Sequence, residues 1–296
     1  MSSIAYITDS KLLELHRLNR NKEMNFWRLT TTNRFTDFEV GDLLFFLSKD
    51  KEHMRKKEKG IVGYGRAAAF ESYALNTMWK KYGELNGYRT KESFREAITK
   101  VSKEHKVPSK ISSIYLKDVV FFQSPIYLSD CGMNISNRVE SFIYLDAKGE
   151  TSFRILDQAK GAEDLWSSKE ASDDLTIEKE QIRGALYSAY NDIKLTTCKN
   201  IKRSHQELLK YILPKDGYAS IKDSKLEGYK IEENNLTIVF APLFLSDKFE
   251  EYRILIGQAN YYRLLLSERY PYDINLEFKT ANNDTELESL LNKKSY

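Results

Sequence analysis

Short apolar runs dominate the first half of the chain. Four of them are rich in β-branched and aromatic residues and predict strands at Phe26–Thr30, Leu43–Leu47, Ile61–Ala69 and Ser141–Leu145. Two further apolar runs, Val119–Phe122 and Ile126–Leu128, predict a strand pair interrupted by Pro125. Glycines open and close several of these runs, and this pattern is typical of a small closed β-barrel.

Two segments with helical periodicity interrupt these strands. Thr77–Glu84 predicts a short helix that ends at Asn86-Gly87. Thr90 is a good N-cap for a second helix over Lys91–His105, which stops before Pro108. We therefore expect helical insertions in the β domain.

The composition changes between Asp157 and Glu180, where eight acidic residues stand against three lysines. Parts of this stretch have no apolar period, which favours a linker or surface loop. The sequence thus predicts three parts: a β domain at 1–146, a linker at 147–175 and a second domain at 176–296. Thr176 is the expected N-cap of the helix that opens this second domain.

The second domain alternates helical and strand patterns. Helices are expected from Thr176, over Ser204–Leu213, from Ser246 to Arg269 and over Thr285–Leu291. Strands are expected at Gly228–Glu232, Leu236–Leu243 and Ile274–Thr280, the first two joined by a turn at 233–235. The expected fold class is therefore α+β, with an α/β second domain.

Charge and cysteine content limit the classes of function. The net charge of +3 is low for a general nucleic-acid binder, so any such contact must come from a local patch. Cys131 and Cys198 form no paired motif, and the first residues lack the features of a signal peptide. No apolar run is long enough to span a bilayer, so we expect a cytoplasmic protein without a membrane partner.

A group of motifs in the first half resembles the EVE branch of the PUA-like domains, which are related to ASCH and YTH domains. The motifs are Trp27 in the first core strand, Gly41-Asp42, Gly60-Ile61-Val62-Gly63, Ile114-x-Leu116 and Pro125-Ile126. The resemblance implies a PUA-like barrel with a hollow that holds one flipped or modified base. It also implies DNA, including modified DNA, as the partner. Long inserts around 48–60 and 75–110 depart from the small members of the family.

Aromatic and basic side chains are the candidates for such a site. The aromatic candidates for stacking on a base are Trp27, Phe35, Tyr64, Trp79 and Tyr82. The basic candidates for phosphate contacts are Lys51, Arg55, Lys56, Lys57, Lys59, Lys80 and Lys81. The alternatives stay open, because alternating aromatics also build a core and a run of charges also forms a solvated loop.

The second domain resembles the restriction-endonuclease-like fold of PD-(D/E)xK nucleases. The resemblance lies in the order of elements and in Ile256–Tyr262, which looks like the Gln-x-x-x-Tyr helix of that family. The strand at Leu236–Leu243 lacks the expected carboxylates and lysine. Asp273, Glu277 and Lys279 spell the motif elsewhere, with Asp273 and Glu277 as ligands of Mg²⁺ if the domain cleaves. A degenerate domain that binds without cleaving is the main expectation.

Three functions remain open on the sequence alone. The first is a protein that binds flipped or modified bases in DNA, in prokaryotic or phage restriction and defence. The second is a modification-dependent, Mg²⁺-dependent endonuclease. The third is a protein that docks onto other proteins, including defence-system proteins, as an inhibitor or an assembly subunit.

Overall fold

The structure is a computed structural model that forms two compact units, Met1–Gln181 and Ile182–Tyr296. The residues that the structure describes are 2–29, 35–52, 58–136, 139, 141–146, 150–160, 172–193, 215–221, 227–232, 235–240, 249–268, 270 and 272–279. The helices expected at 204–213 and 285–291 lie outside these residues, as do parts of the expected linker.

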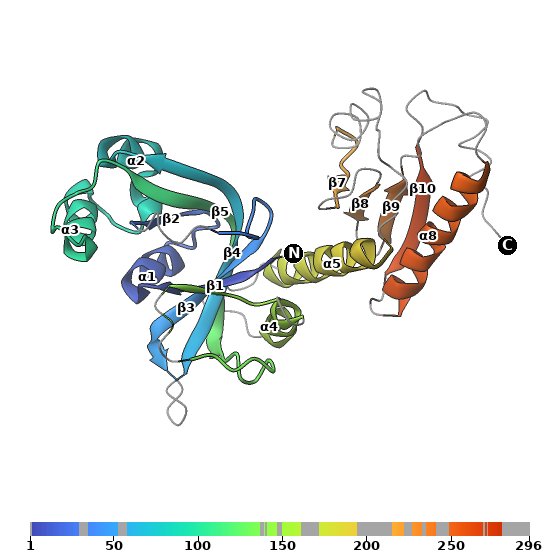
Figure 1. Ribbon diagram of the computed structural model, residues 1–296, viewed down its shortest axis with the longest axis horizontal. Coiled ribbons are helices and arrows are strands. Elements are labelled where there is room, and N and C mark those ends of the chain that lie inside the picture. The colour runs from blue at the N-terminus through green and yellow to red at the C-terminus, as the bar shows by residue number, and fades with distance from the viewer. Residues whose placement is uncertain are drawn as a thin grey trace. The chain divides into compact units, whose positions relative to one another are not determined.

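The first unit is built on one six-stranded sheet (Figure 1). Its strands are β1 (Ile4–Thr8), β2 (Met24–Arg28), β3 (Leu43–Glu52), β4 (Lys59–Tyr73), β5 (Ile111–Ile126) and β6 (Phe142–Tyr144). They lie in the order β2-β5-β4-β3-β1-β6, with β1 and β3 parallel and all other neighbours antiparallel. The expected α+β class is confirmed, with a second sheet of four strands in the other unit.

The six-stranded sheet is strongly curled. Tyr6 on β1 and Phe26 on β2 meet edge to face with ring centroids 5.0 Å apart, although β3, β4 and β5 lie between them. In a flat sheet, four strand spacings of about 4.8 Å would hold them roughly 19 Å apart. Among the described residues β2 and β6 form no ladder with each other, so the sheet is curled but not closed, in contrast to the predicted closed barrel.

Large side chains fill the concave side of this curl. The buried residues there include Ile4, Tyr6, Phe26, Leu44 and Phe46, and helix α1 (Ser10–Leu18) adds two leucines. These side chains form a packed core on the concave side of the sheet. The hollow for a nucleobase that the sequence led us to expect is therefore not found among these side chains.

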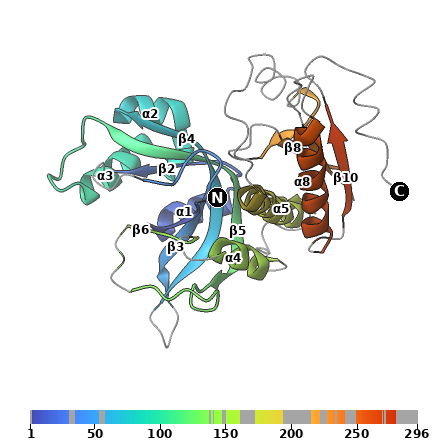
Figure 2. The same ribbon diagram turned by 45° about the vertical axis from the view of Figure 1, so that its right-hand side comes forward.

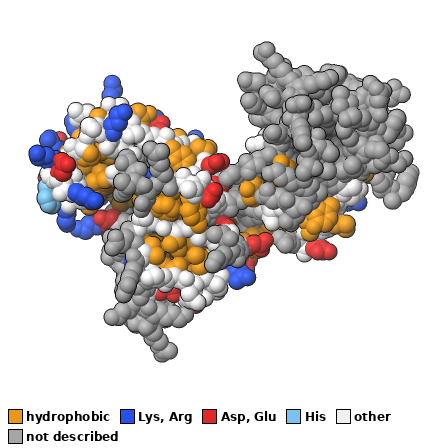
Figure 3. Space-filling model, viewed as in Figure 1, with side chains coloured by type: hydrophobic (Ala, Val, Ile, Leu, Met, Phe, Trp, Pro, Cys, Tyr) orange, Lys and Arg blue, Asp and Glu red, His pale blue; other side chains and the backbone are white. Residues whose placement is uncertain are grey.

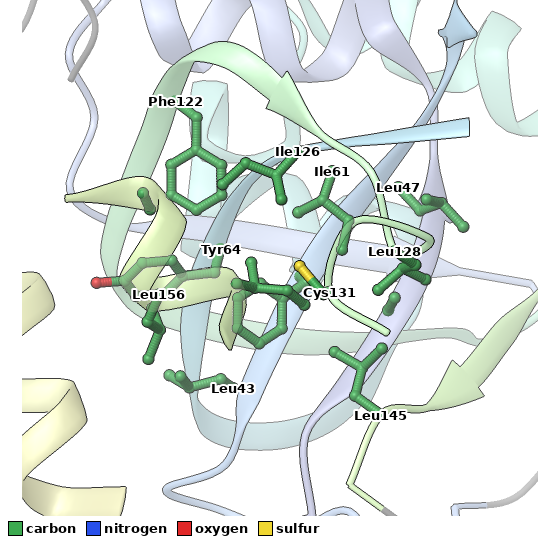
Figure 4. Close-up of a cluster of buried hydrophobic side chains, with 14 of the residues drawn as sticks. Leu43, Leu47, Ile61, Tyr64, Phe122, Ile126, Leu128, Cys131, Leu145 and Leu156 are labelled. Carbon is green, nitrogen blue, oxygen red and sulfur yellow. The ribbon is translucent and has the colours of Figure 1, made fainter. Parts of the chain in front are cut away.

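A second core covers the convex side of the same strands. Phe45, Leu47 and Tyr64 pack there with residues of α4 (Thr151–Ala159), as Figure 4 shows. Because neighbouring residues of a strand point to opposite faces, β3 contributes to both cores in alternation. Cys131 lies in this core as a free thiol, and burial raises its pKa to about 11.

Two elements near the N-terminus were not predicted. β1 follows the first three residues, and α1 begins after Asp9, whose carboxylate accepts a hydrogen bond from the Lys11 backbone N–H at 2.9 Å. This is an ordinary N-cap. The strand pair expected around Pro125 is one long strand, β5, with Pro125 next to its last residue.

A helical segment connects β4 to β5 on the outside of the sheet. It contains α2 (Leu75–Tyr82), the 3-10 turn η1 (Gly83–Asn86) and α3 (Lys91–Val101). We call residues 75–110 the insertion. Thr90 and Ser93 form a capping box at the start of α3, as the Thr90 cap predicted. The helix ends four residues before the expected His105, because Ser102 is extended.

The second unit contains a four-stranded sheet with helices on one face (Figures 1 and 2). Its elements are α5 (Ser172–Ile193, shared with the first unit), β7 (Ala219–Ser220), β8 (Glu227–Glu232), β9 (Asn235–Phe240), α8 (Phe249–Ser267) and β10 (Asp273–Phe278). The strand order is β10-β9-β8-β7, with β9 and β10 parallel. The predicted β8–β9 pairing is confirmed.

Helix α5 begins earlier than the sequence suggested. It starts at Ser172, inside the acidic stretch expected to be a linker, so Thr176 lies within the helix. Within the described residues, no helix has both the length and the apolar character that crossing a membrane requires.

Candidate nucleic-acid interface

The insertion carries an excess of positive charge. Residues 75–110 hold nine Lys and Arg against four Glu, an excess that exceeds the net charge of +3 of the whole chain. Its cations are all exposed except the half-buried Lys91: Lys80, Lys81, Arg89, Lys91, Arg95, Lys100, Lys103, Lys106 and Lys110. Figure 3 shows blue side chains on the surface where Figure 1 places α2 and α3. The local basic patch that the low net charge demands is therefore present.

Within the described part of the chain, most of these cations are not neutralised by carboxylates. Lys81 is the exception, because its ammonium lies 2.5 Å from Glu71 and also donates to the Tyr73 hydroxyl at 3.2 Å. Among the described residues the other eight form no ion pair. Solvated, unpaired cations are the groups that exchange small counterions for phosphates.

Lys81 and Tyr82 belong to a polar network at the base of α2. The Tyr82 hydroxyl donates to the Glu71 carboxylate, and burial together with this bond raises the pKa of Tyr82 to about 12. The hydrogen bond to Glu71 raises the pKa of Lys81 above its usual range. Both side chains proposed for ligand contact thus also anchor α2 to β4.

Beneath the basic surface lies an aromatic cluster, which we define as Trp27, Trp79, Tyr88 and Phe94. The fully buried Phe94 ring is at its centre, with centroids 5.6 Å from Trp27, 6.0 Å from Trp79 and 5.6 Å from Tyr88. The other three rings are half-buried. The cluster joins the insertion to the outer face of the sheet and still presents ring surface to solvent.

The structure separates the other aromatic candidates from this cluster. Tyr64 is fully buried in the convex core against Phe45 and Phe122. Phe35 packs against Phe142 at 4.9 Å, with the Arg28 guanidinium 4.2 Å from its centroid. The five aromatic residues predicted to share one pocket therefore lie in three places.

The basic candidates are separated in the same way. Lys51 and Lys59 lie at the β3–β4 hairpin, at one end of the 15-residue strand β4, whereas Lys80 and Lys81 follow its other end (Figures 1 and 2). Arg55, Lys56 and Lys57 lie outside the described residues, and the side chain of Lys51 is not described.

Several cations of the insertion were not singled out from the sequence. Arg89, Arg95 and Lys100 are exposed on or next to α3, and each stands between polar neighbours as any surface residue would. A count of charges over 75–110 is the signal that could have found them.

In the second unit, Asp273 and Glu277 lie on β10, on the face that points away from the helices, and Lys279 directly follows the strand. Asp273 and Glu277 are four residues apart on one strand, which corresponds to about 13 Å along the backbone. Their two carboxylates therefore do not lie side by side. Glu277 accepts a hydrogen bond from the Tyr218 hydroxyl at 2.7 Å. Lys279 Nζ forms an ion pair with Asp216 Oδ2 at 2.8 Å. Burial and the bond to Glu277 raise the pKa of Tyr218. Within the described residues, no group of three His, Cys, Asp or Glu is arranged to hold a metal ion.

Comparisons with known proteins place the N-terminal half beside solved ASCH structures. A single-residue mutant of ZmASCH from Zymomonas mobilis is 14% identical, with a TM-score of 0.37, over 53% of this chain and 98% of that one. Unmutated ASCH from Zymomonas mobilis gives the same identity and score over 94% of its length. Protein PSPTO5229 from Pseudomonas syringae is 15% identical, with a TM-score of 0.31, over 52% of this chain and 99% of that one. Neither a protein-family model nor a curated protein sequence matches the chain.

Proposed function

We propose that this protein binds DNA through the insertion of its first unit. The observation that carries the proposal is the set of nine cations on 75–110, all but Lys91 exposed, eight of which form no ion pair among the described residues. Cations of this kind release counterions when they neutralise phosphates, and this release drives binding that weakens as salt rises. We assign binding to this surface because the insertion holds nine Lys and Arg against four Glu.

The finer part of the proposal is that the protein recognises a flipped or modified base. Trp27, Trp79 and Tyr88 offer half-buried rings directly beneath the basic surface. An extruded base loses its stacking partners, and an aromatic ring restores stacking worth about 1–3 kcal/mol per base. Phosphate contacts from the insertion would position the strand while the rings meet the base.

For the second unit we propose a nuclease-like domain that binds or assembles and does not cleave. The described helices and strands follow the order α5, β7, β8, β9, α8, β10, which suits the restriction-endonuclease-like fold expected from the sequence. Glu277 and Lys279 are engaged by Tyr218 and Asp216, which supports a structural role for both. We place both proposed activities, recognition of a base by the first unit and binding or assembly by the second, in restriction or defence in a prokaryote or phage.

The experiment that tests the proposal is fluorescence anisotropy of a short labelled duplex with increasing amounts of the full-length protein. Fully paired DNA, DNA with one unpaired base and DNA with modified cytosine are compared at several salt concentrations. We expect salt-sensitive binding to all three and tighter binding to the duplexes with an unpaired or modified base. Absence of binding to every duplex at low salt would contradict the proposal and would favour docking onto other proteins.

A further inference from the structure

Three buried polar atoms at the interface between the insertion and the sheet have no hydrogen-bond partner within the described part of the chain. They are Asn25 Oδ1, Trp27 Nε1 and Ser113 Oγ. Asn25 is 0% exposed and Ser113 is 3% exposed. Buried polar atoms are nearly always paired, so three of them together require an explanation.

The three side chains lie on one face of the sheet. Trp27 on β2 is directly opposite Ser113 on β5, so both side chains project from the same side. Asn25 precedes Trp27 by two residues and therefore shares that side. The insertion covers it, since Trp27 contacts Phe94 of α3 and Asn25 bonds to Asn86 of η1.

The hydrogen bonds around Asn86 fix which atom of Asn25 is left over. Asn86 Nδ2 donates to the Gly83 carbonyl at 2.7 Å, and a carbonyl can only accept, so the amide orientation of Asn86 is determined. Its Oδ1 must then accept from Asn25 Nδ2, at 2.9 Å. The atom that Asn25 leaves without a partner is therefore an acceptor, Oδ1.

The set thus combines an acceptor, a donor and a group that can be either. Asn25 Oδ1 accepts, the indole N–H of Trp27 donates, and the Ser113 hydroxyl does both. The hydrogen-bonding edge of a nucleobase carries donors and acceptors side by side on a flat ring. The half-buried rings of Trp27 and Tyr88, 6.3 Å apart, add a surface for stacking.

From this juxtaposition we propose that Asn25, Trp27 and Ser113 read the identity of an unpaired nucleobase between η1 and the outer face of the sheet. The inference rests on the proposed DNA binding and assigns its specificity to these three residues. Asn86 closes this face in the present structure, so a base enters when η1 moves and the Asn25–Asn86 bond opens. The base then takes the place of Asn86 beside Asn25.

The test compares duplexes that carry a single unpaired A, C, G or T. Binding by the wild-type protein is measured by anisotropy for all four, together with its salt dependence. Two variants follow: Ser113→Ala, which removes one hydroxyl, and Trp27→Phe, which removes the indole N–H together with one of its two rings. We expect the wild-type protein to prefer one or two bases and each variant to lose roughly 5- to 10-fold of that preference. The salt dependence should not change, because the phosphate contacts remain.

Ser112→Ala is the matched control, because Ser112 adjoins Ser113 on β5 and points to the opposite face. It should keep the preference of the wild-type protein. Circular dichroism and thermal unfolding of each variant verify folding. Ser113→Ala removes a buried oxygen that has no hydrogen-bond partner among the described residues, so we do not expect it to lower the midpoint of thermal unfolding.

Two results would overturn the inference and leave the proposed DNA binding intact. One is wild-type protein that binds DNA equally well with any unpaired base. The other is full retention of the preference in both Ser113→Ala and Trp27→Phe, which would assign these atoms to the fold alone. A wild-type protein that binds no DNA would overturn the proposed function itself, and this inference with it.

Discussion

The indole of Trp27 on β2 meets the Phe94 ring of α3 nearly edge to face, with centroids 5.6 Å apart and planes at 74°. Phe94 is fully buried, and Trp79 and Tyr88 pack against the same ring. This one side chain therefore joins α2, α3 and the sheet. The orientation of the basic surface relative to the strands depends on it.

Replacing Phe94 by Ala is expected to destabilise the protein strongly. The change removes the centre of the aromatic cluster and leaves a cavity, for which about 3–5 kcal/mol is usual. Urea denaturation followed by circular dichroism measures it. Phe70→Ala is the matched control, because Phe70 is 42% exposed and its loss should change the free energy of unfolding by much less. Equal effects of the two changes would contradict the central position of Phe94.

Local signals in the sequence predicted many of the elements. The apolar runs that became β3 and β4, the Thr90 cap of α3 and the β8–β9 pairing all follow from short-range rules that hold wherever the segment lies. β1 and α1 were not predicted, although Asp9 marks a helix start.

The arrangement of the candidate site could not be predicted in this way. Trp27 and Tyr64 both lie on strands, yet they pack in different clusters, because they lie at different places along the long strands β4 and β5 of the sheet. The length of β4 separates Lys59 from Lys80. A curled sheet also brings distant strands together, as Tyr6 and Phe26 show, and only the folded backbone reveals this.

Glu180 on α5 forms a buried ion pair with Arg66 on β4, and the Arg66 guanidinium also donates to Asp118 at 3.0 Å and to the Gly41 carbonyl at 3.1 Å. Glu180 is 3% exposed, whereas Asp118 is 51% exposed. Glu180→Gln should lower the free energy of unfolding by about 3 kcal/mol, because it leaves the buried guanidinium of Arg66 without the negative charge of Glu180.

The isosteric change Asp118→Asn provides the comparison, and for an exposed pair a loss of about 1 kcal/mol or less is expected. Asp118 has φ of 50°, a conformation that Asn also accepts, so the backbone is not disturbed. Denaturation of the two variants in parallel gives the difference. An Asp118→Asn protein less stable than Glu180→Gln would show that the buried pair is not the stronger link.

Stability should also depend on pH through His16. Its ring is fully buried, Nδ1 accepts from the Asn21 amide at 3.0 Å, and burial lowers its pKa from 6.5 to about 4. The unfolded chain therefore binds this proton first as pH falls. The contribution is present above pH 6.5 and is lost between about pH 6.5 and 4.

Unfolding curves for the wild-type protein and His16→Leu across this pH range isolate the effect from the carboxylates. The wild-type protein should lose more stability than the variant as pH falls from 6.5 to 4, by roughly 3 kcal/mol. Parallel pH profiles for the two proteins would mean that His16 is protonated at little cost in the folded state.

Incubation with Mg²⁺ tests whether the second unit cleaves DNA. Glu277 is held by Tyr218, and about 13 Å of strand separates it from Asp273, so we expect plain and cytosine-modified DNA to stay intact. Gel electrophoresis after incubation provides the readout. Cleavage that disappears in Glu277→Gln would establish the endonuclease alternative and reject the non-cleaving domain.

The central claim is that cations of the insertion contact DNA phosphates. A variant with Arg89→Gln, Arg95→Gln and Lys100→Gln removes three exposed positive charges that have no ion pair among the described residues. Each lost phosphate contact should reduce the slope of log K against log salt by about 0.9 for duplex DNA. The three together should flatten it by up to about 2.7, with weaker binding at low salt.

The comparison with a charge-matched variant is decisive. Lys160→Gln, Lys215→Gln and Arg263→Gln remove three exposed charges outside the insertion, so both triple variants have the same net charge. The salt dependence of DNA affinity is measured for both and for the wild-type protein. The account predicts a flattened slope for the insertion variant and a wild-type slope for the control. Equal slopes for the two triple variants would contradict it.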